Sequence, residues 1–366
     1  MHITCNRESI QKYVANADRV TGKNLSLPIL NSILLTASHK TLIIRATNLE
    51  VGVEFHIPAD VKKEGSIALS GSLLANTLAS IPDEQEISIS ADKGLCTITT
   101  KTKTLTIKGF LPDDFPTIPV IKDGEGFIMS AGKFIQGAKS VLMSAALSDI
   151  KPEISSVYLH QIADMVVFTS TDLFRLAEKK IKQSGVTISH GVIIPIKNIT
   201  EIVRVLESTT EDISFLITKN QISCSGNSVY ITSRVVQGVY PDYEQILPKS
   251  HTTEVVILKQ DLLNTLKLST LFSDKFNKVV IKIDPIKKTC IVSTKNTEVG
   301  DTESHLTTTL SGDPVEISLN GKHLFDCLGA IEKDSVVLEF NSSDKPAVIR
   351  GLGDNSFTYL TMPLTR

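Results

Sequence analysis

The side chains that could perform catalysis do not gather into any motif along this chain. Gly351-Leu352-Gly353 is a lone G-x-G with no predicted helix after it, so a turn is favoured over a phosphate-binding loop. The eight His residues form no H-x-x-x-H pair, and Asp113-Asp114 stands in a turn bracketed by prolines. No G-x-S-x-G, P-loop or C-x-x-C motif occurs. The sequence therefore predicts a protein that is not an enzyme, with no catalytic residues, no cofactor and no metal site.

Basic side chains offer a different chemistry, which is contact with phosphate groups. Lys197 and Arg204 are seven residues apart, so a helix would place both on one face. The opposite face would carry an apolar stripe made of Ile199, Ile202, Val203 and Leu206. Such cations bind phosphates without regard to base sequence, and the affinity falls with added salt. The same charges are also expected on an ordinary solvated helix face, so the residues alone leave both interpretations open.

The helix that must position Lys197 and Arg204 belongs to a unit that occurs three times. A short apolar strand, Val192–Ile194, ends at Pro195, which with Lys197 fits a first helical turn. The turn residue recurs at a constant spacing of 125 residues, as Ser70, Pro195 and Asn320. In the other two copies the same stripe follows the turn residue, at Leu74, Thr77, Leu78 and Ile81 and at Leu324, Cys327, Leu328 and Ile331. Three copies in one register predict a triplicated domain.

The predicted fold class is α+β, with three tandem copies of a β-rich domain in which two helices pack on antiparallel sheets. Each copy is expected to run as strand, helix, three strands, strand, helix and three strands. Proline- and charge-rich segments near Pro116–Gly126 and Pro248–Thr253 suggest domains at 1–122, 123–250 and 251–366. The end strands would be open edges, which a closed ring of copies could pair.

The composition fits a globular protein rather than a membrane or secreted one. Of 366 residues, 41% are apolar and 21% are charged, and the net charge of −2 argues against a generally basic surface. The five widely spaced Cys fit reduced thiols. Arg7 and Glu8 stand where a signal peptide needs apolar residues, and no apolar run is long enough to span a membrane. We therefore expect a cytoplasmic protein with no membrane partner.

Several short motifs match one known family in order and spacing across the whole chain. These are Leu27-Pro28-Ile29-Leu30, Thr47-Asn48-Leu49-Glu50, Thr171-Asp172, Arg175-Leu176, Tyr240-Pro241-Asp242-Tyr243, Leu247-Pro248 and Met362-Pro363. With the triple repeat, the chain resembles the β subunit of bacterial DNA polymerase III, the DNA sliding clamp. That resemblance implies a head-to-tail homodimer that closes into a ring around double-stranded DNA. It also implies partners, namely the polymerase III catalytic subunit, the clamp loader and other proteins with a clamp-binding motif.

The resemblance implies a set of DNA-facing cations on the helices and one loop. The family positions correspond to Arg7, Lys12, Lys23, Lys139, Lys197 and Arg204. Two further basic positions of the family are occupied here by Asn24 and Ser72. These departures keep a second hypothesis open, in which the chain is a clamp-fold interaction scaffold that does not encircle DNA.

The resemblance also implies a groove for partner peptides between the second and third copies. The matching residues are Ile154, Thr171, Leu173, Phe174, Arg175, Leu176, Pro241, Ile246, Asn320, Leu360, Met362 and Pro363. Aliphatic walls, a Met and one Arg donor suit a peptide. Because the family has Gly-His where this chain has Leu173-Phe174, we expect a narrower or more apolar groove. Ordinary packing is the alternative, since Leu176 and Leu360 would suit any core.

A dimer interface is the third implied site. Leu105 and Ile107 alternate with polar residues on a probable edge strand, and Leu271 and Phe272 occupy the matching family position at the other end of the chain. The alternative is that these residues belong to the buried core of their own domains.

Overall fold

The computed structural model describes residues 1–22, 27–81 and 85–364. Its residues divide into two compact units. The first contains residues 1–135, 185–189 and 197–237, and the second contains 136–184, 190–196 and 238–366. The central copy therefore contributes to both units, because its strands join one sheet in each. In the described part of the chain, no helix is long and apolar enough to cross a membrane.

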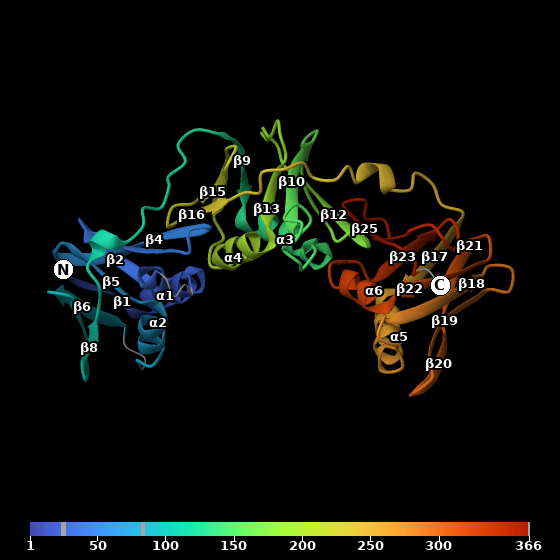
Figure 1. Ribbon diagram of the computed structural model, residues 1–366, viewed down its shortest axis with the longest axis horizontal. Helices are drawn as coiled ribbons and strands as arrows, with labels where there is room; N and C mark the ends of the chain where they lie inside the picture. The colour runs from blue at the N-terminus through green and yellow to red at the C-terminus, as the bar shows by residue number, and fades with distance from the viewer. Residues whose placement is uncertain (23–26, 82–84, 365–366) are drawn as a thin grey trace. The chain divides into compact units, whose positions relative to one another are not determined.

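The first copy follows the expected order of strands and helices (Figure 1). Its elements are β1 (His2–Asn6), α1 (Arg7–Val20), η1 (Pro28–Asn31), β2 (Ser32–Ser38), β3 (Thr41–Thr47), β4 (Val51–Lys63), β5 (Gly65–Ser70), α2 (Gly71–Ala79), β6 (Glu86–Asp92), β7 (Leu95–Thr99), β8 (Thr104–Lys108) and η2 (Pro112–Asp114). Helix α1 begins where the Asn6 side chain accepts a hydrogen bond from the Ser9 N–H at 2.9 Å, which satisfies an otherwise unpaired donor.

The second copy repeats that order. Its elements are β9 (Glu125–Ser130), α3 (Ala131–Lys139), η3 (Leu142–Ser144), β10 (Ser156–Ile162), β11 (Met165–Thr171), β12 (Arg175–Lys182), β13 (Val192–Pro195), α4 (Ile196–Leu206), β14 (Asp212–Ile217), β15 (Gln221–Ser225), β16 (Val229–Arg234) and η4 (Glu244–Ile246). Pro195 closes the strand instead of opening the helix, which corrects the predicted first turn. Because β13 is the last strand of its sheet, a residue without an N–H is tolerated there.

The third copy differs from the predicted order in one place. Its elements are β17 (Thr253–Leu258), α5 (Lys259–Leu271), β18 (Lys278–Asp284), β19 (Thr289–Asn296), β20 (Gly300–His305), β21 (Thr308–Gly312), β22 (Val315–Asn320), α6 (Gly321–Leu328), β23 (Ser335–Phe340), β24 (Ala347–Gly351) and β25 (Phe357–Thr361). The first copy has one long strand, β4, that pairs with β3 and then with β1. Here the same path is split into β20, which pairs with β19, and β21, which pairs with β17.

The sheets of the first unit form one antiparallel network of twelve strands. Its main path runs β8-β7-β6-β1-β4-β16-β15-β14-β9, and β2, β3 and β5 branch from it. The pairing of β4 with β16 joins the first copy to the second, and Gly52 stands opposite Thr232. We call this pairing the first joint.

The second unit contains a nine-stranded sheet, ordered β13-β10-β11-β12-β25-β24-β23-β17-β21, and a four-stranded sheet, ordered β20-β19-β18-β22. The pairing of β12 with β25 joins the second copy to the third, and Leu176 stands opposite Leu360. We call this pairing the second joint. Both joints pair the same strand of one copy with the last strand of the next copy.

Helices lie beside one another in pairs and bury aliphatic stripes. Helix α1 packs against α2 in the first unit, and α5 packs against α6 in the second (Figure 1). On α4, Ile199, Ile202, Val203 and Leu206 are all at most 2% exposed, as the stripe predicted. The three tandem copies, each with two helices on antiparallel sheets, are thereby confirmed.

Candidate functional site

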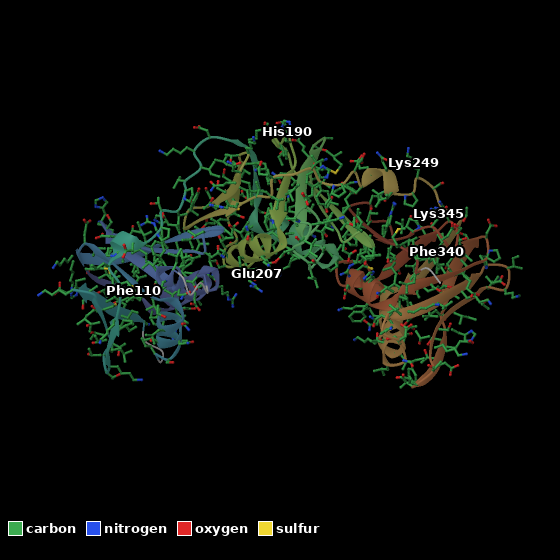
Figure 2. The ribbon with its side chains drawn as sticks, viewed as in Figure 1. Phe110, His190, Glu207, Lys249, Phe340 and Lys345 are labelled. Atoms are coloured by element: carbon green, nitrogen blue, oxygen red, sulfur yellow. The ribbon has the colours of Figure 1, made fainter. Side chains whose placement is uncertain are left out.

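Helix α4 carries two of the predicted DNA-facing cations on one exposed face. Lys197 and Arg204 are both exposed, opposite the buried stripe. The Arg204 guanidinium donates to the Glu201 carboxylate at 2.6 Å, so part of its charge is balanced on the same helix. Figure 2 shows a further acid, Glu207, directly after this helix. The two cations on α4 are therefore matched by two acids on or directly after the same helix, and the helix together with Glu207 carries no net positive charge.

The other predicted cations are placed differently from one another. The Arg7 guanidinium donates to the Ile81 carbonyl at 2.8 Å, which ties the start of α1 to the end of α2. Lys12 is exposed and donates to the Ser208 carbonyl at 2.7 Å. Lys139 is exposed in the last turn of α3. Lys23 lies outside the described residues. Arg7, Lys12 and Arg204 are thus each already engaged with another group of the protein.

The predicted groove residues fall into a buried floor and an exposed rim. The exposed rim consists of four residues, Leu173, Phe174, Ile246 and Met362. Phe174 is the most exposed of them, at 67%. The floor is fully packed and consists of Ile154, Thr171, Leu176 and Leu360. Pro241, Asn320 and Pro363 are partly exposed. The Met362 N–H donates to the Phe174 carbonyl at 2.8 Å, so residues far apart in sequence meet at this rim.

Arg175 supports the groove as a brace. Its side chain is only 12% exposed and forms two ion pairs, with Asp172 and with Asp326, both at 2.9 Å. These contacts fix the turn before β12 against helix α6. Asn320 has a related role, because its side chain accepts hydrogen bonds from the Lys322 and His323 N–H groups and begins α6. The expected Arg donor is thus already committed to the protein.

Sequence reasoning missed the residues that anchor the linker beside the groove. The Tyr243 hydroxyl donates to the Glu178 carboxylate at 2.7 Å and lies 2.9 Å from His160 Nε2. Tyr240 stacks on Tyr158, with ring centroids 4.6 Å apart. Burial lowers the pKa of His160, which favours the neutral imidazole. The Tyr240–Tyr243 motif was the available signal, since two buried tyrosines in a linker imply fixed contacts.

Of the predicted dimer residues, Leu105 and Ile107 lie on strand β8, whereas Leu271 ends helix α5 and Phe272 follows it, next to the start of β20. Strand β8 ends the twelve-stranded sheet, and β20 ends the four-stranded sheet. Leu105 is half-buried and Ile107 is buried within the first unit. In the second unit, Leu271 is 69% exposed and Phe272 is half-buried. Ile107 is thus a core residue of its own domain, and Leu271 is available for a contact.

Within the described residues, the side chains that usually bind metals are dispersed and the thiols are buried. Among residues 1–22, 27–81 and 85–364, no three His, Cys, Asp or Glu side chains gather as a metal site would require. All five thiols are buried, and burial raises the pKa of Cys96 and of Cys290 to about 11. Gly353 has a φ of 73° within a turn, as predicted for the lone G-x-G.

Comparison with known proteins covers the whole chain. Three family models match, described as the N-terminal, central and C-terminal domains of the DNA polymerase III beta subunit, at residues 1–119, 129–242 and 244–365. A beta sliding clamp from Synechococcus elongatus is 24% identical over 371 residues, covering 100% of this chain and 99% of the relative.

Solved structures show the same fold. The DNA polymerase sliding clamp from Bacillus subtilis has a TM-score of 0.94 at 21% identity, covering 100% of this chain and 99% of that one. The DNA polymerase III subunit beta from Pseudomonas aeruginosa bound to griselimycin has a TM-score of 0.95 at 23% identity, covering 100% of both chains.

Proposed function

This chain belongs to the DNA polymerase III beta subunit family, and we propose that it acts as a DNA sliding clamp that closes as a head-to-tail homodimer around duplex DNA. It catalyses nothing itself and tethers the replicative polymerase, so that synthesis is processive. The family match over three consecutive domains carries this proposal. The family also supports action in the cytoplasm and domain limits at 1–122, 123–250 and 251–366.

The strand pairing supports the head-to-tail dimer. In each joint, a strand pairs with the last strand of the next copy, as β4 with β16 and β12 with β25. The strands β4 and β12 both follow a turn in which an Asn or Asp side chain, Asn48 or Asp172, accepts backbone N–H groups. By the same rule, β20 of one chain is left to pair with β8 of a second chain. That pairing covers both open edges, which otherwise risk uncontrolled association. Leu105, Leu271 and Phe272 are the proposed apolar contacts of this interface, and Ile107 packs behind Leu105 in the core of its own domain.

Charge at the two edges supports the same pairing. Strand β8 and its neighbouring turns carry exposed lysines, namely Lys93, Lys101, Lys103 and Lys108, with Asp92 opposing them. Strand β20 and the turn before it carry exposed acids, namely Glu298, Asp301 and Glu303, with Lys295 opposing them. Opposite signs on the two edges favour an unlike pairing of β8 with β20 over pairing of like edges.

A ring holds DNA by topology, so weak basic faces are sufficient. Arg7, Lys12, Lys23, Lys139, Lys197 and Arg204 are the proposed DNA-side cations. Phosphate contacts of this kind do not depend on base sequence and weaken steeply as salt is added. The chain can therefore move along duplex DNA while the closed ring prevents its loss.

The exposed groove rim supports binding of partner peptides. We propose that the twelve groove residues named above bind the polymerase III catalytic subunit, the clamp loader and other proteins with a clamp-binding motif. Large exposed apolar side chains such as Phe174 and Ile246 are costly to leave in water and are typical of a contact surface.

Loading onto nicked circular DNA tests the ring. After assembly by a clamp loader, the protein is expected to remain with the circle through gel filtration and to leave once the circle is cut. Light scattering should give twice the mass of one chain. Retention on the cut DNA would overturn topological binding and favour a scaffold that does not encircle DNA.

The cations of α4 can be tested separately. Lys197→Glu combined with Arg204→Glu is expected to reduce clamp-stimulated synthesis several-fold at moderate salt, because both charges face outward. Thermal melting should stay close to that of the wild type. A large loss of melting temperature would contradict their placement on the exposed face.

A further inference from the structure

His323 lies in the first turn of helix α6, and the sequence prediction of the groove did not include it. Its backbone N–H donates to the Asn320 side chain at 3.2 Å, and its carbonyl accepts the Tyr359 hydroxyl at 2.9 Å. These two bonds hold His323 between Asn320, which is a predicted groove residue, and strand β25. His323 is half-buried, whereas Leu324 beside it is only 1% exposed, so part of the histidine remains open to solvent.

The imidazole of His323 stands in a cluster of charged side chains. Arg175 and Asp172 face it from the start of β12 and the turn before that strand, and Asp326 and Lys322 face it from its own helix. Arg175 pairs with Asp172 and with Asp326, both at 2.9 Å, and Lys322 is exposed. Burial lowers the pKa of His323, and the two cations act in the same direction, whereas the two carboxylates oppose them. The imidazole is therefore mainly neutral at pH 7.5.

This cluster is continuous with the exposed rim of the groove. The Phe174 N–H donates to the Asp172 carboxylate at 3.0 Å, and the Met362 N–H donates to the Phe174 carbonyl at 2.8 Å. A peptide that packs on Phe174 and Met362 therefore lies beside the cluster and removes water from it. Loss of water disfavours the charged form of His323, while the guanidinium of Arg175 stays nearby. Occupation of the groove should thus favour the neutral imidazole further.

We propose that His323 is a further residue of the groove, which contacts the bound peptide in its neutral form, so that protonation of His323 weakens peptide binding. The proposal rests on the peptide-binding function proposed above and adds its regulation by pH. The complex holds fewer protons than the free protein, so the affinity falls as the pH falls through the range in which free His323 titrates. Above that range the affinity is constant. For a single proton the change is limited to about tenfold per pH unit.

The test uses the full-length protein and a peptide that does not itself titrate. The peptide is acetylated and amidated, and it has two adjacent leucines as its anchor between Gln and Ser residues. Isothermal titration calorimetry measures Kd from pH 7.5 to 5.5 and, from two buffers with different ionisation enthalpies, the number of protons released. The variants are His323→Gln and His323→Phe, which both remove the titrating group. His39→Gln is the matched control, because His39 is an exposed histidine in the turn between β2 and β3.

The Kd of the wild type should rise roughly threefold from pH 7.5 to 5.5, with protons released on binding at the lower pH. His39→Gln should behave in the same way, whereas both His323 variants should keep one Kd over the whole range. His323→Phe should stay closest to the wild type at pH 7.5, because it keeps a ring for the peptide to contact.

The outcomes separate this inference from the groove itself. If the wild type binds the peptide equally well at every pH and releases no proton, the role of His323 is wrong and the groove stands. If the His323 variants keep the pH dependence, another group carries it and the inference is again wrong. If the wild type binds no peptide at any pH, the groove assignment fails. Thermal melting checks the folding of the two variants, and if one does not fold, the other decides.

Discussion

The first and second joints have the same backbone but present different surfaces. In the first, Thr47 Oγ1 donates to the Val51 carbonyl at 2.9 Å, and Leu49 has a φ of 75°. In the second, Thr171 Oγ1 donates to the Arg175 carbonyl at 2.7 Å, and Leu173 also has a φ of 75°. This left-handed conformation is uncommon for leucine, so both turns are held by their hydrogen bonds.

The residue pair at the centre of each joint explains the difference. Gly52 and Thr232 leave space in the first joint, and the linker residue Ile118 fills it and is only 8% exposed. A Cβ on Gly52 would lie 2.8 Å from Ile118 Cγ2. The Tyr230 hydroxyl holds this linker by accepting the Ile121 N–H at 2.9 Å and donating to the Pro119 carbonyl at 3.0 Å.

In the second joint, two leucines occupy the equivalent positions. Leu176 and Leu360 fill the floor themselves and are at most 1% exposed. The linker residue Ile246 remains 49% exposed beside them. The first joint is therefore covered by its own linker, whereas the second leaves apolar side chains at the surface. Two differences at this central pair, Gly52 against Leu176 and Thr232 against Leu360, thus accompany the change from a joint covered by its linker to one with exposed apolar side chains.

The largest effect is expected when the brace of the second joint is removed. Arg175→Val introduces the residue that the first joint has at this place, Val51, and leaves Asp172 and Asp326 without their cation. We expect the free energy of unfolding in urea to fall by roughly 3 kcal/mol, as when one partner of a buried ion pair is removed. Arg204→Val is the control, because its exposed pair should contribute at most about 1 kcal/mol. Equal losses for both would contradict the bracing role.

The next largest effect on stability is expected when Gly52 of the first joint is replaced by leucine, the residue that the second joint has at the equivalent position. Gly52→Leu should displace Ile118 and lower the free energy of unfolding by roughly 1–3 kcal/mol, as overpacking does. Limited proteolysis should also cut the linker near Ile118 faster. Gly132→Leu is the matched control, because a Cβ there would meet no atom within 4 Å. An unchanged proteolysis rate in Gly52→Leu would mean that Ile118 is not held by this contact.

A smaller change should affect binding without affecting stability. Phe174→Glu gives the second joint the residue at the matching position of the first, Glu50, and removes an exposed apolar contact. We expect the affinity for a leucine-anchored peptide to fall roughly tenfold, with a stability change below about 0.5 kcal/mol. The reverse variant, Glu50→Phe, should gain no peptide binding, because Ile118 covers that floor. Binding by Glu50→Phe would show that the floor does not matter.

The smallest effect is a pH dependence of stability that arises at His160, beside the second joint. Burial lowers the pKa of His160, although Glu178 opposes and Lys180 reinforces this shift. Below the ordinary His pKa of about 6.5, the unfolded chain takes up this proton first, so stability falls as the pH falls. Above that pH the contribution is fully present. His160→Gln should reduce the change of the urea-unfolding midpoint between pH 5 and 7. If the midpoint of the variant varies with pH as that of the wild type does, His160 is not a source of the pH dependence.

Local patterns predicted the repeat and its helices well. The stripe at Ile199 to Leu206 and its two echoes depend on residues within one or two turns, so periodicity alone located them. Asn6 was also predictable as the start of α1, because capping is a local hydrogen bond. The third copy was less predictable, since the break between β20 and β21 falls in a polar stretch without alternation.

The candidate sites divide in the same way. The exposed face with Lys197 and Arg204 follows from their spacing, and the motif at Tyr240–Tyr243 identified the right linker. The ion pairs of Arg175 did not follow, because Asp326 is far away in sequence. The packing of Ile118 against Gly52 was not predicted either, although a glycine inside a strand is a known sign that another group approaches the backbone closely.

By itself, the sequence determined a triplicated α+β chain with aliphatic cores, a recognisable family and no catalytic motif. Only the tertiary structure decided which strands pair across the joints and which linker residue is buried. The physical reason is range. Periodicity and caps act over a few residues, whereas strand pairing and packing bring together residues more than a hundred positions apart.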